Sequence, residues 1–192
     1  MVLIACSCKT DSPKLLNKAG IAPYQLSESE KYILQSFGME NNSKIISFYA
    51  PEEAITVIVN VYRLDSDNNW DKIGGGGISI GADKGFAEQL TGTFTIQLRE
   101  NYAIDYNINA GGRASYKTDE IMLDIEVGLS IKCFLQEFQE IEINKEIPVA
   151  LMIYGSGTVM RICSPQDFFD PSAFDGMALV QAVTLTFSDK EL

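Results

Sequence analysis

The chain has 192 residues, a length that suits one ordinary domain. Hydrophobic residues make up 46% of the chain and charged residues 21%, so the composition is that of a globular protein and excludes a disordered or collagen-like one. Histidine is absent, which excludes imidazole-dependent catalysis and histidine-ligated metals. The formal net charge of −11 opposes electrostatic binding to nucleic acid or to an anionic membrane surface.

The four cysteines form a close pair, Cys6 and Cys8, and two distant singles, Cys133 and Cys163. This spacing does not match a zinc site, because Cys-x-Cys is tighter than the usual gap and no second paired motif follows. We therefore expect no metal and no cofactor. The spacing leaves open whether Cys133 and Cys163 form a disulfide or remain buried free thiols.

Near the N-terminus, Leu3-Ile4-Ala5-Cys6 resembles the lipobox of bacterial lipoproteins, in which a lipid is attached to the cysteine. A secretion signal has a basic start and an apolar stretch of about 7 to 15 residues, so the resemblance implies a truncated signal peptide. The polar residues up to position 13 have the character of a tether. The alternative interpretation is an ordinary apolar N-terminus that matches the pattern by chance.

With this motif and a β-rich body, the whole chain is similar to small uncharacterised surface lipoproteins of Gram-positive bacteria. The resemblance implies lipidation at Cys6 and a place on the extracellular face of the cell envelope, with membrane attachment through the lipid only. It implies no reaction. The cytoplasm is the alternative location.

Two short helices are predicted within a helical N-terminal segment over residues 14–43. The first is expected over residues 14–19, because Ser12-Pro13 precedes it and Gly20 follows it. The second is expected over residues 28–37, where Ser27 and Glu30 have capping-box spacing. The apolar residues of the second helix fall on one side, so we expect that side to pack on a sheet; they are Tyr32, Ile33 and Phe37.

From residue 44 onward apolar and polar residues alternate, which is typical of strands with one buried face. The clearest alternating runs cover residues 55–62, 93–99, 102–109, 121–127, 149–153 and 183–187. No ten-residue amphipathic helix separates them, which argues against a parallel α/β sheet. We predict a mainly β fold, an antiparallel β-sandwich of about eight to ten strands over residues 44–192, with the helical segment at one edge or opening.

Two turn regions invite a ligand-binding interpretation. Asp65 to Asn69 opens like a calcium loop, but Trp70 and Gly76 stand where such a loop needs glycine and glutamate, so a hairpin turn is predicted. The glycine run 74–77 lacks the following Lys-Ser/Thr and helix of a phosphate cradle, so a bend or bulge in a strand is predicted.

The C-terminal third of the chain contains two further local signals. Glycines 155 and 157 predict the turn of a second hairpin, whose return strand runs over residues 158–162. Ser164-Pro165 predicts one capped helical turn that continues through Phe169.

Candidate partner-binding residues lie in two connections, residues 65–77 and 111–119, because loops carry function more often than strand interiors. Trp70 is the natural anchor, since an exposed indole gives a large contact area, and Arg113 and Tyr116 are the candidates in the second connection. The alternative for Trp70 is that it caps the core of its own hairpin.

The leading functional interpretation is a non-enzymatic, envelope-exposed binding or interaction domain with an unknown protein or glycan partner. A carbohydrate-binding module is an alternative, because aromatic side chains on a sandwich stack on sugar rings; the candidates are Trp70, Tyr49, Tyr62 and Tyr116. A small carboxylate-based hydrolase is a second alternative, although the acids on the strands are expected to face solvent; they are Asp105, Asp124 and Glu126.

Overall fold

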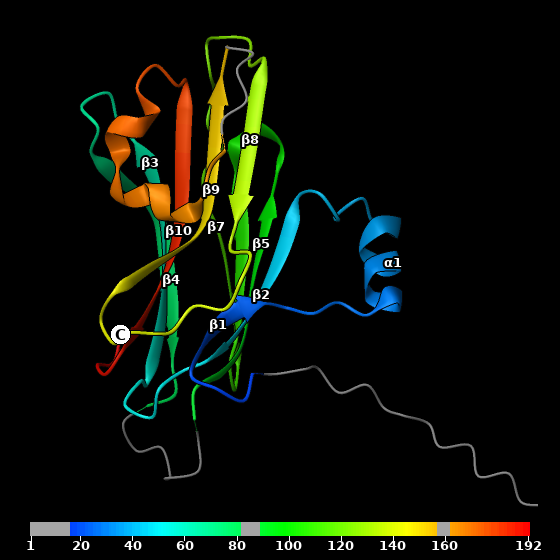
Figure 1. The fold of residues 1–192 in the computed structure, drawn as a ribbon, viewed down its shortest axis with the longest axis vertical. Coiled ribbons are helices and arrows are strands. Elements are labelled where there is room, and N and C mark those ends of the chain that lie inside the picture. The colour runs from blue at the N-terminus through cyan, green and yellow to red at the C-terminus, as the bar shows by residue number, and fades with distance from the viewer. Residues whose placement is uncertain (1–15, 82–88, 157–161) are drawn as a thin grey trace, which may run out of the picture.

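The computed structural model describes residues 16–81, 89–156 and 162–192, which form two five-stranded antiparallel sheets packed face to face (Figure 1). The predicted antiparallel β-sandwich is confirmed. Sheet A has the strand order β1-β2-β5-β6-β7, and sheet B has the order β4-β3-β10-β9-β8.

The strands of sheet A are β1 (Gly20–Pro23), β2 (Ser43–Tyr49), β5 (Thr91–Leu98), β6 (Ile104–Asn109) and β7 (Arg113–Lys117). The strands of sheet B are β3 (Thr56–Leu64), β4 (Trp70–Ser79), β8 (Leu129–Phe134), β9 (Glu146–Gly155) and β10 (Leu179–Ser188). The helical elements are α1 (Glu28–Ser36) and the 3₁₀ turns η1 (Glu100–Tyr102), η2 (Pro165–Phe169) and η3 (Pro171–Phe174).

The main hydrophobic core lies between the two sheets and follows from the alternation in the sequence. Val57, Val59 and Val61 of β3 are fully buried on the face that meets sheet A. The rings of Phe48 and Phe187 contact each other across the gap, with centroids 5.4 Å apart. Burial of apolar area on these inner faces supplies the main stabilisation of the sandwich.

A second hydrophobic cluster covers part of the outer face of sheet B. Phe168 of η2 and Phe174 of η3 pack over β9 and β10, and the cluster includes Ile153 and Val180. The Ser164 side chain accepts a backbone hydrogen bond within η2 and Asp167 completes the capping box, so the predicted helical turn is confirmed. The return strand predicted over residues 158–162 falls almost entirely outside the described residues.

The glycine run belongs to β4 and is explained by close packing. A register shift opposite Val61 and Tyr62 supplies the predicted bulge. A Cβ atom at Gly76 would lie 2.3 Å from the ring of Tyr116 on β7, so only glycine lets the edges of the two sheets approach here.

The prediction of a helix over residues 14–19 is wrong for residues 16–19, the part that the structure describes. Residues 17–19 form bends, and β1 begins at Gly20. Ile21 is fully buried and exchanges two backbone hydrogen bonds with Gln139, so tertiary pairing overrides the local helix signals. The sandwich therefore includes part of the segment expected to be helical. The lipobox-like residues 3–6 and the tether lie outside the described residues.

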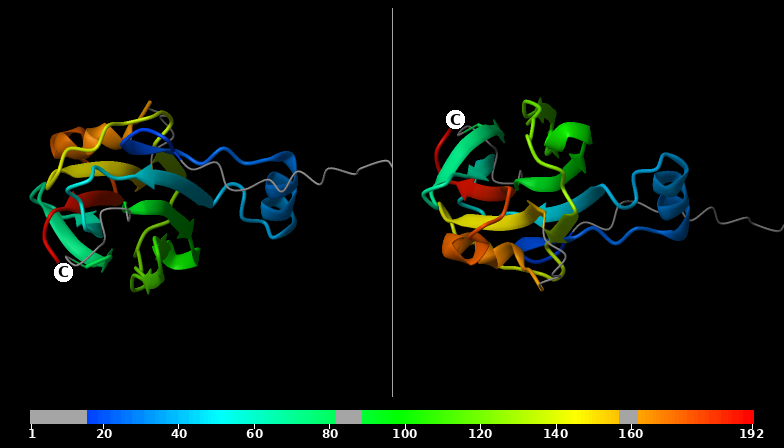
Figure 2. Two further views of the ribbon diagram at one scale, coloured as in Figure 1. Left: turned by 90° about the horizontal axis from the view of Figure 1, so that it is seen from below. Right: turned by 90° about the horizontal axis from the view of Figure 1, so that it is seen from above.

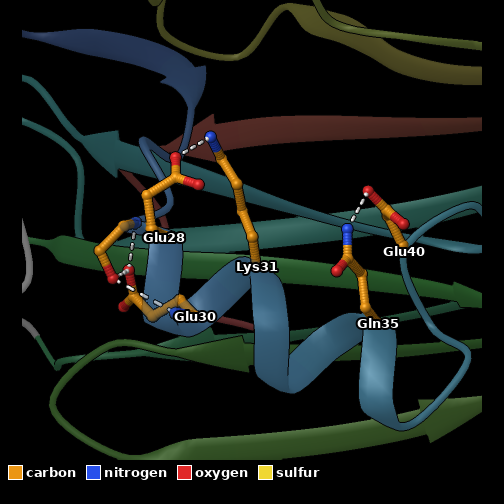
Figure 3. Close-up of polar contacts among 6 residues, drawn as sticks. Glu28, Glu30, Lys31, Gln35 and Glu40 are labelled. Atoms are coloured by element: carbon orange, nitrogen blue, oxygen red, sulfur yellow. Dashed lines mark hydrogen bonds and ion pairs between the residues drawn. The ribbon is translucent and has the colours of Figure 1, made fainter.

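The second helix is confirmed as α1, with the predicted capping box. The backbone N–H of Ser27 donates to the Glu30 carboxylate at 2.7 Å, which lowers the pKa of Glu30 (Figure 3). Its predicted packing is wrong, because none of its nine described residues is buried against the described chain. Tyr32 is 71% exposed and Ile33 is 53% exposed. Figure 2 shows α1 held away from both sheets on an extended arm.

Two assignments between residues 111 and 128 are also corrected. The predicted strand over residues 121–127 is absent from the described chain, whereas the predicted loop over residues 111–119 contains β7. The side chains of Ile121, Leu123 and Val127 do pack on the main core. The alternation of apolar and polar residues in this segment therefore indicated burial correctly, although the backbone does not pair with a strand. The strand predicted from residue 102 begins at Ile104, after η1.

Candidate functional site

A polar hollow of about 930 Å³ opens at one end of the sandwich. Sheet A contributes the ends of β5 and β7 and the start of β6, and sheet B contributes β8 and the end of β9. The connection from α1 to β2 forms another wall. Lining residues that bear on function are Phe37, Asn42, Arg99, Asn101, Tyr102, Asp105, Lys117, Glu120, Ser130, Lys132 and Tyr154.

Most charges around the polar hollow are paired. Arg99 Nε lies 2.7 Å from Asp105 Oδ2, and Lys117 Nζ lies 4.0 Å from Glu120 Oε1. Lys132 instead donates to the amide oxygen of Asn42 at 2.6 Å, which leaves its charge without an acidic partner among the described residues. Lys132 is therefore the cation of the hollow that is free to meet an external acid.

Two tyrosines contribute aromatic surface to the polar hollow. The rings of Tyr102 and Tyr154 meet edge to face, with centroids 4.7 Å apart. Burial raises the pKa of Tyr154 to about 12, and the neighbouring Tyr102 adds to this effect. The Tyr154 phenol is therefore neutral at physiological pH.

The backbone beside the hollow is strained. Asn101 and Tyr102 are consecutive left-handed residues, with φ angles of 53° and 62°. Such conformations cost of the order of 1–3 kcal/mol each and cluster at functional sites. Here they are held by hydrogen bonds from Gln181 Nε2 to Tyr102 O and from the Ile121 N–H to Asn101 O.

The backbone of β8 borders the polar hollow and forms an outer edge of sheet B. The Leu135 N–H donates to Val149 O of β9 at 2.9 Å. Because bonded and non-bonded pairs alternate along antiparallel strands, the odd-numbered residues of β8 bond to β9. The backbone N–H and C=O groups of Ser130 and Lys132 consequently point to the open side of the strand.

A second hollow lies by the C-terminal end of β8, at the disulfide between Cys133 and Cys163. We call it the disulfide cleft; its volume is about 550 Å³ and its lining is more apolar than that of the polar hollow. The Cα atoms of the two cysteines are 6.1 Å apart, within the usual range for a disulfide. Phe134, Phe138 and Pro165 contribute apolar surface to it.

The structure places Trp70 in the outer cluster of sheet B. Its ring stacks on Phe168 with centroids 4.9 Å apart, and its indole N–H donates to Phe168 O at 2.9 Å. This geometry favours the alternative in which Trp70 packs in the core around its hairpin. It lines neither the polar hollow nor the disulfide cleft.

Arg113 and Tyr116 both lie on β7 and do not meet Trp70. Tyr116 packs between the edges of the sheets, where its hydroxyl donates to Gly77 O and accepts from the Gly77 N–H. Arg113 is exposed and donates to Asn107 at 3.3 Å. The three predicted partner-binding residues therefore do not form one site.

The hairpin turn predicted over residues 65–69 is confirmed, and the side-chain carboxylate of Asp65 accepts hydrogen bonds from the backbone of the same turn. One carboxylate oxygen of Asp65 accepts backbone hydrogen bonds from Asp67 and Asn69, both at 2.8 Å. The Asn69 bond is the main reason that the pKa of Asp65 is lowered. The described residues contain no group of three or more acidic, histidine or cysteine side chains that could hold a metal.

The acids expected on outward faces do point away from the core. Asp105 is on the outward face of β6, where it pairs with Arg99 at the polar hollow, and Asp124 and Glu126 are exposed, although on an irregular segment. Sequence reasoning missed the polar hollow, because its lining comes from strand ends of both sheets that are far apart in the sequence. The available signal was Asn101 between two strands, since asparagine tolerates left-handed turns.

Comparisons of the chain with models of protein families, with curated proteins and with solved structures find no match. None of the helices formed by the described residues has the length and apolar character required to cross a membrane. The features that bear on function are the disulfide, the two hollows and the open edge of β8.

Proposed function

We propose that the chain is a non-enzymatic binding domain displayed on the outer face of the cell envelope. The single observation that carries the proposal is the disulfide between Cys133 and Cys163, two residues separated by 30 positions in the sequence. Disulfides persist in oxidising compartments and are rare in the cytosol. The disulfide cleft, which this bridge lines, and the polar hollow provide the contact surface.

Attachment through a lipid at Cys6 is part of the proposal. It is supported by the similarity of Leu3-Ile4-Ala5-Cys6 to a lipobox. The net charge of −11 does not favour binding to an anionic membrane by electrostatics, so a covalent lipid is the simpler means of attachment.

A binding role suits the acids of the described chain better than hydrolysis does. A carboxylate-based hydrolase needs one carboxyl group held protonated by its surroundings. The carboxyl groups with a clear shift all have a lowered pKa; they are Glu30, Asp65 and Glu140. Asp105 in the polar hollow is held in an ion pair with Arg99.

A glycan ligand is the second candidate and is favoured by the composition of the polar hollow. Phe37 at the rim is 75% exposed, and Tyr102 and Tyr154 add aromatic surface among amide and charged groups. Exposed rings beside hydrogen-bonding groups suit a sugar, which presents apolar ring faces and hydroxyl groups.

The location is tested in intact cells of the native organism. We expect an externally added protease to degrade the chain and a maleimide reagent to label Cys133 and Cys163 only after reduction. Radiolabelled fatty acid should appear on the wild-type chain, disappear in Cys6→Ser and remain in the matched control Cys8→Ser. Protection from protease together with free, readily labelled thiols would contradict the proposed location.

Glycan binding is tested on an array with the purified, oxidised domain. If a glycan occupies the polar hollow, Phe37→Ala should weaken its binding at least tenfold. Tyr32→Ala is the matched control, because Tyr32 is an equally exposed aromatic residue on the same arm but does not line the hollow. Equal effects of the two substitutions would exclude the hollow as the glycan site.

A further inference from the structure

We propose that β8 receives an extended segment of a partner protein, which adds to sheet B as a further strand. The inference rests on the proposed function as a binding domain and specifies the partner as an unfolded or extended polypeptide. Addition to an exposed strand edge obtains affinity from main-chain hydrogen bonds and specificity from pockets for alternate side chains.

The edge of β8 has open backbone groups, whereas two other sheet edges are covered. The β1 edge is closed by the two hydrogen bonds between Ile21 and Gln139. On β4, both backbone groups of Gly77 are bonded to the Tyr116 hydroxyl. The structure gives the backbone groups of Ser130 and Lys132 no partner within the described residues.

A hollow lies on each of the two sides of β8. Ser130 and Lys132 line the polar hollow on the inner side, and Lys132 also borders the disulfide cleft, which Cys133 lines on the outer side. Successive side chains of an added strand point to opposite faces of the sheet. Such a strand would therefore direct alternate side chains toward the polar hollow and toward the disulfide cleft.

The side chains around β8 indicate the chemistry of the added segment. Lys132 lacks an acidic partner among the described residues, so an acidic side chain on the inner face of the added strand would be favoured. The apolar surface of Phe138 and Pro165 favours apolar side chains on the outer face. The segment we infer alternates an acidic or polar residue with an apolar one.

The same lysine argues against one pairing of this chain with a second copy. An antiparallel pairing of two β8 strands centred on Lys132 would place two lysines directly opposite each other. Like charges in that position destabilise a strand pair. An acidic segment of another protein has no such conflict.

The probe for the experiment is a set of peptides selected from a phage-displayed random dodecapeptide library on the purified, oxidised domain. We expect the selected peptides to alternate acidic and apolar residues. Lys132→Pro removes an N–H that points outward from β8 and should weaken peptide binding at least tenfold. The hydrogen bonds between β8 and β9 should remain, because the Lys132 N–H is not one of them. Lys132→Ala keeps the N–H and should have a smaller effect.

Ser115→Pro is the matched control on the other sheet. By the same register argument, the Ser115 N–H on β7 points away from β6. Peptide affinity should stay within about twofold of wild type in this variant. Equal loss in Ser115→Pro and Lys132→Pro, or loss in Ser115→Pro alone, would overturn the proposal.

Amide hydrogen exchange supplies a measurement that does not depend on a proline variant folding. Saturating peptide should slow exchange at Ser130 and Lys132 at least tenfold and leave Ser115 unchanged. Unchanged exchange at β8, failure to select any peptide, or slowing caused by concentration-dependent dimers would each overturn the proposal. Surface exposure of the chain and the glycan array are measured separately, so the broader function can stand if this inference fails.

Discussion

The two helical elements with complete capping boxes, α1 and η2, have opposite surroundings. Ser27 and Glu30 begin α1, and Ser164 and Asp167 begin η2, with the same reciprocal hydrogen bonds. However, α1 has no buried residue among those described, whereas η2 buries Phe168 and lies beside a disulfide. A capping box therefore determines where a helical element begins and has little influence on what the element packs against.

The two elements should differ in what stabilises them. A helix of nine residues is marginal in water without tertiary packing, so α1 depends on its local hydrogen bonds and on any partner. The η2 turn is held by aromatic packing over sheet B. The same kind of substitution should therefore have a large effect in η2 and a small one in α1.

The largest expected difference is between two phenylalanines. Phe168→Ala should lower the free energy of unfolding by about 3 to 5 kcal/mol, because it removes a buried ring that stacks on Trp70. Phe37→Ala should change it by less than about 0.5 kcal/mol, since that ring is exposed. Urea denaturation of both variants measures the contrast, and equal losses would show that the α1 arm packs more tightly than we conclude.

The disulfide should have the next largest effect. Replacing Cys133 and Cys163 together with serine should lower the free energy of unfolding by about 3 to 4 kcal/mol, from the entropy of the loop that the bridge closes. Denaturation of the variant and of reduced wild type should agree. Amide exchange in α1 should stay unchanged, and faster exchange there would link the arm to the η2 region.

A pH effect is expected from the sandwich body. The phenol of Tyr154 has a pKa of about 12 in the folded chain and about 10 when unfolded. Its contribution is fully present below pH 10 and is lost as pH rises toward 12, because the unfolded chain releases the proton first. The loss is about 2 to 3 kcal/mol at 1.36 kcal/mol per pKa unit.

Denaturation midpoints between pH 9 and pH 12 test this dependence. Tyr154→Phe should make this dependence less steep without abolishing it, because burial also raises the pKa values of Tyr62 and Tyr106. Tyr32→Phe on the exposed α1 helix should leave it as in wild type. An equally steep loss of stability in Tyr154→Phe would assign the alkaline effect to other groups.

The smallest expected effects come from the caps themselves. Ser164→Ala should lower the free energy of unfolding by about 1 kcal/mol, because η2 is coupled to the packed outer cluster. Ser27→Ala should reduce the helical population of α1, read from amide chemical shifts, without moving the global denaturation midpoint. A global shift of similar size in both variants would remove the distinction between the two elements.

Two of the errors of sequence reasoning share one physical origin. Alternation reports which side chains are buried, and Ile121, Leu123 and Val127 are partly buried as the pattern indicates. It does not report whether the backbone has a strand beside it to pair with. In the opposite case, Gly20 to Pro23 gives a weak strand signal but pairs with β2.

By itself, the sequence determined the features that depend on neighbours along the chain. These are the alternating strands of an antiparallel sandwich, the hairpin turn at Asp65 and the capping boxes at Ser27 and Ser164. Their hydrogen bonds and periodicities are local, so a short stretch of residues is sufficient to specify them.

Only the tertiary structure decided which residues meet across the sheets. It packed Trp70 against Phe168, joined Cys133 to Cys163 and left the edge of β8 open between two hollows. These outcomes depend on strand order and on the packing of segments more than 25 residues apart, as the 30-residue separation of the two cysteines shows. Local propensity contains no information about such contacts, because they form only when the whole core is buried.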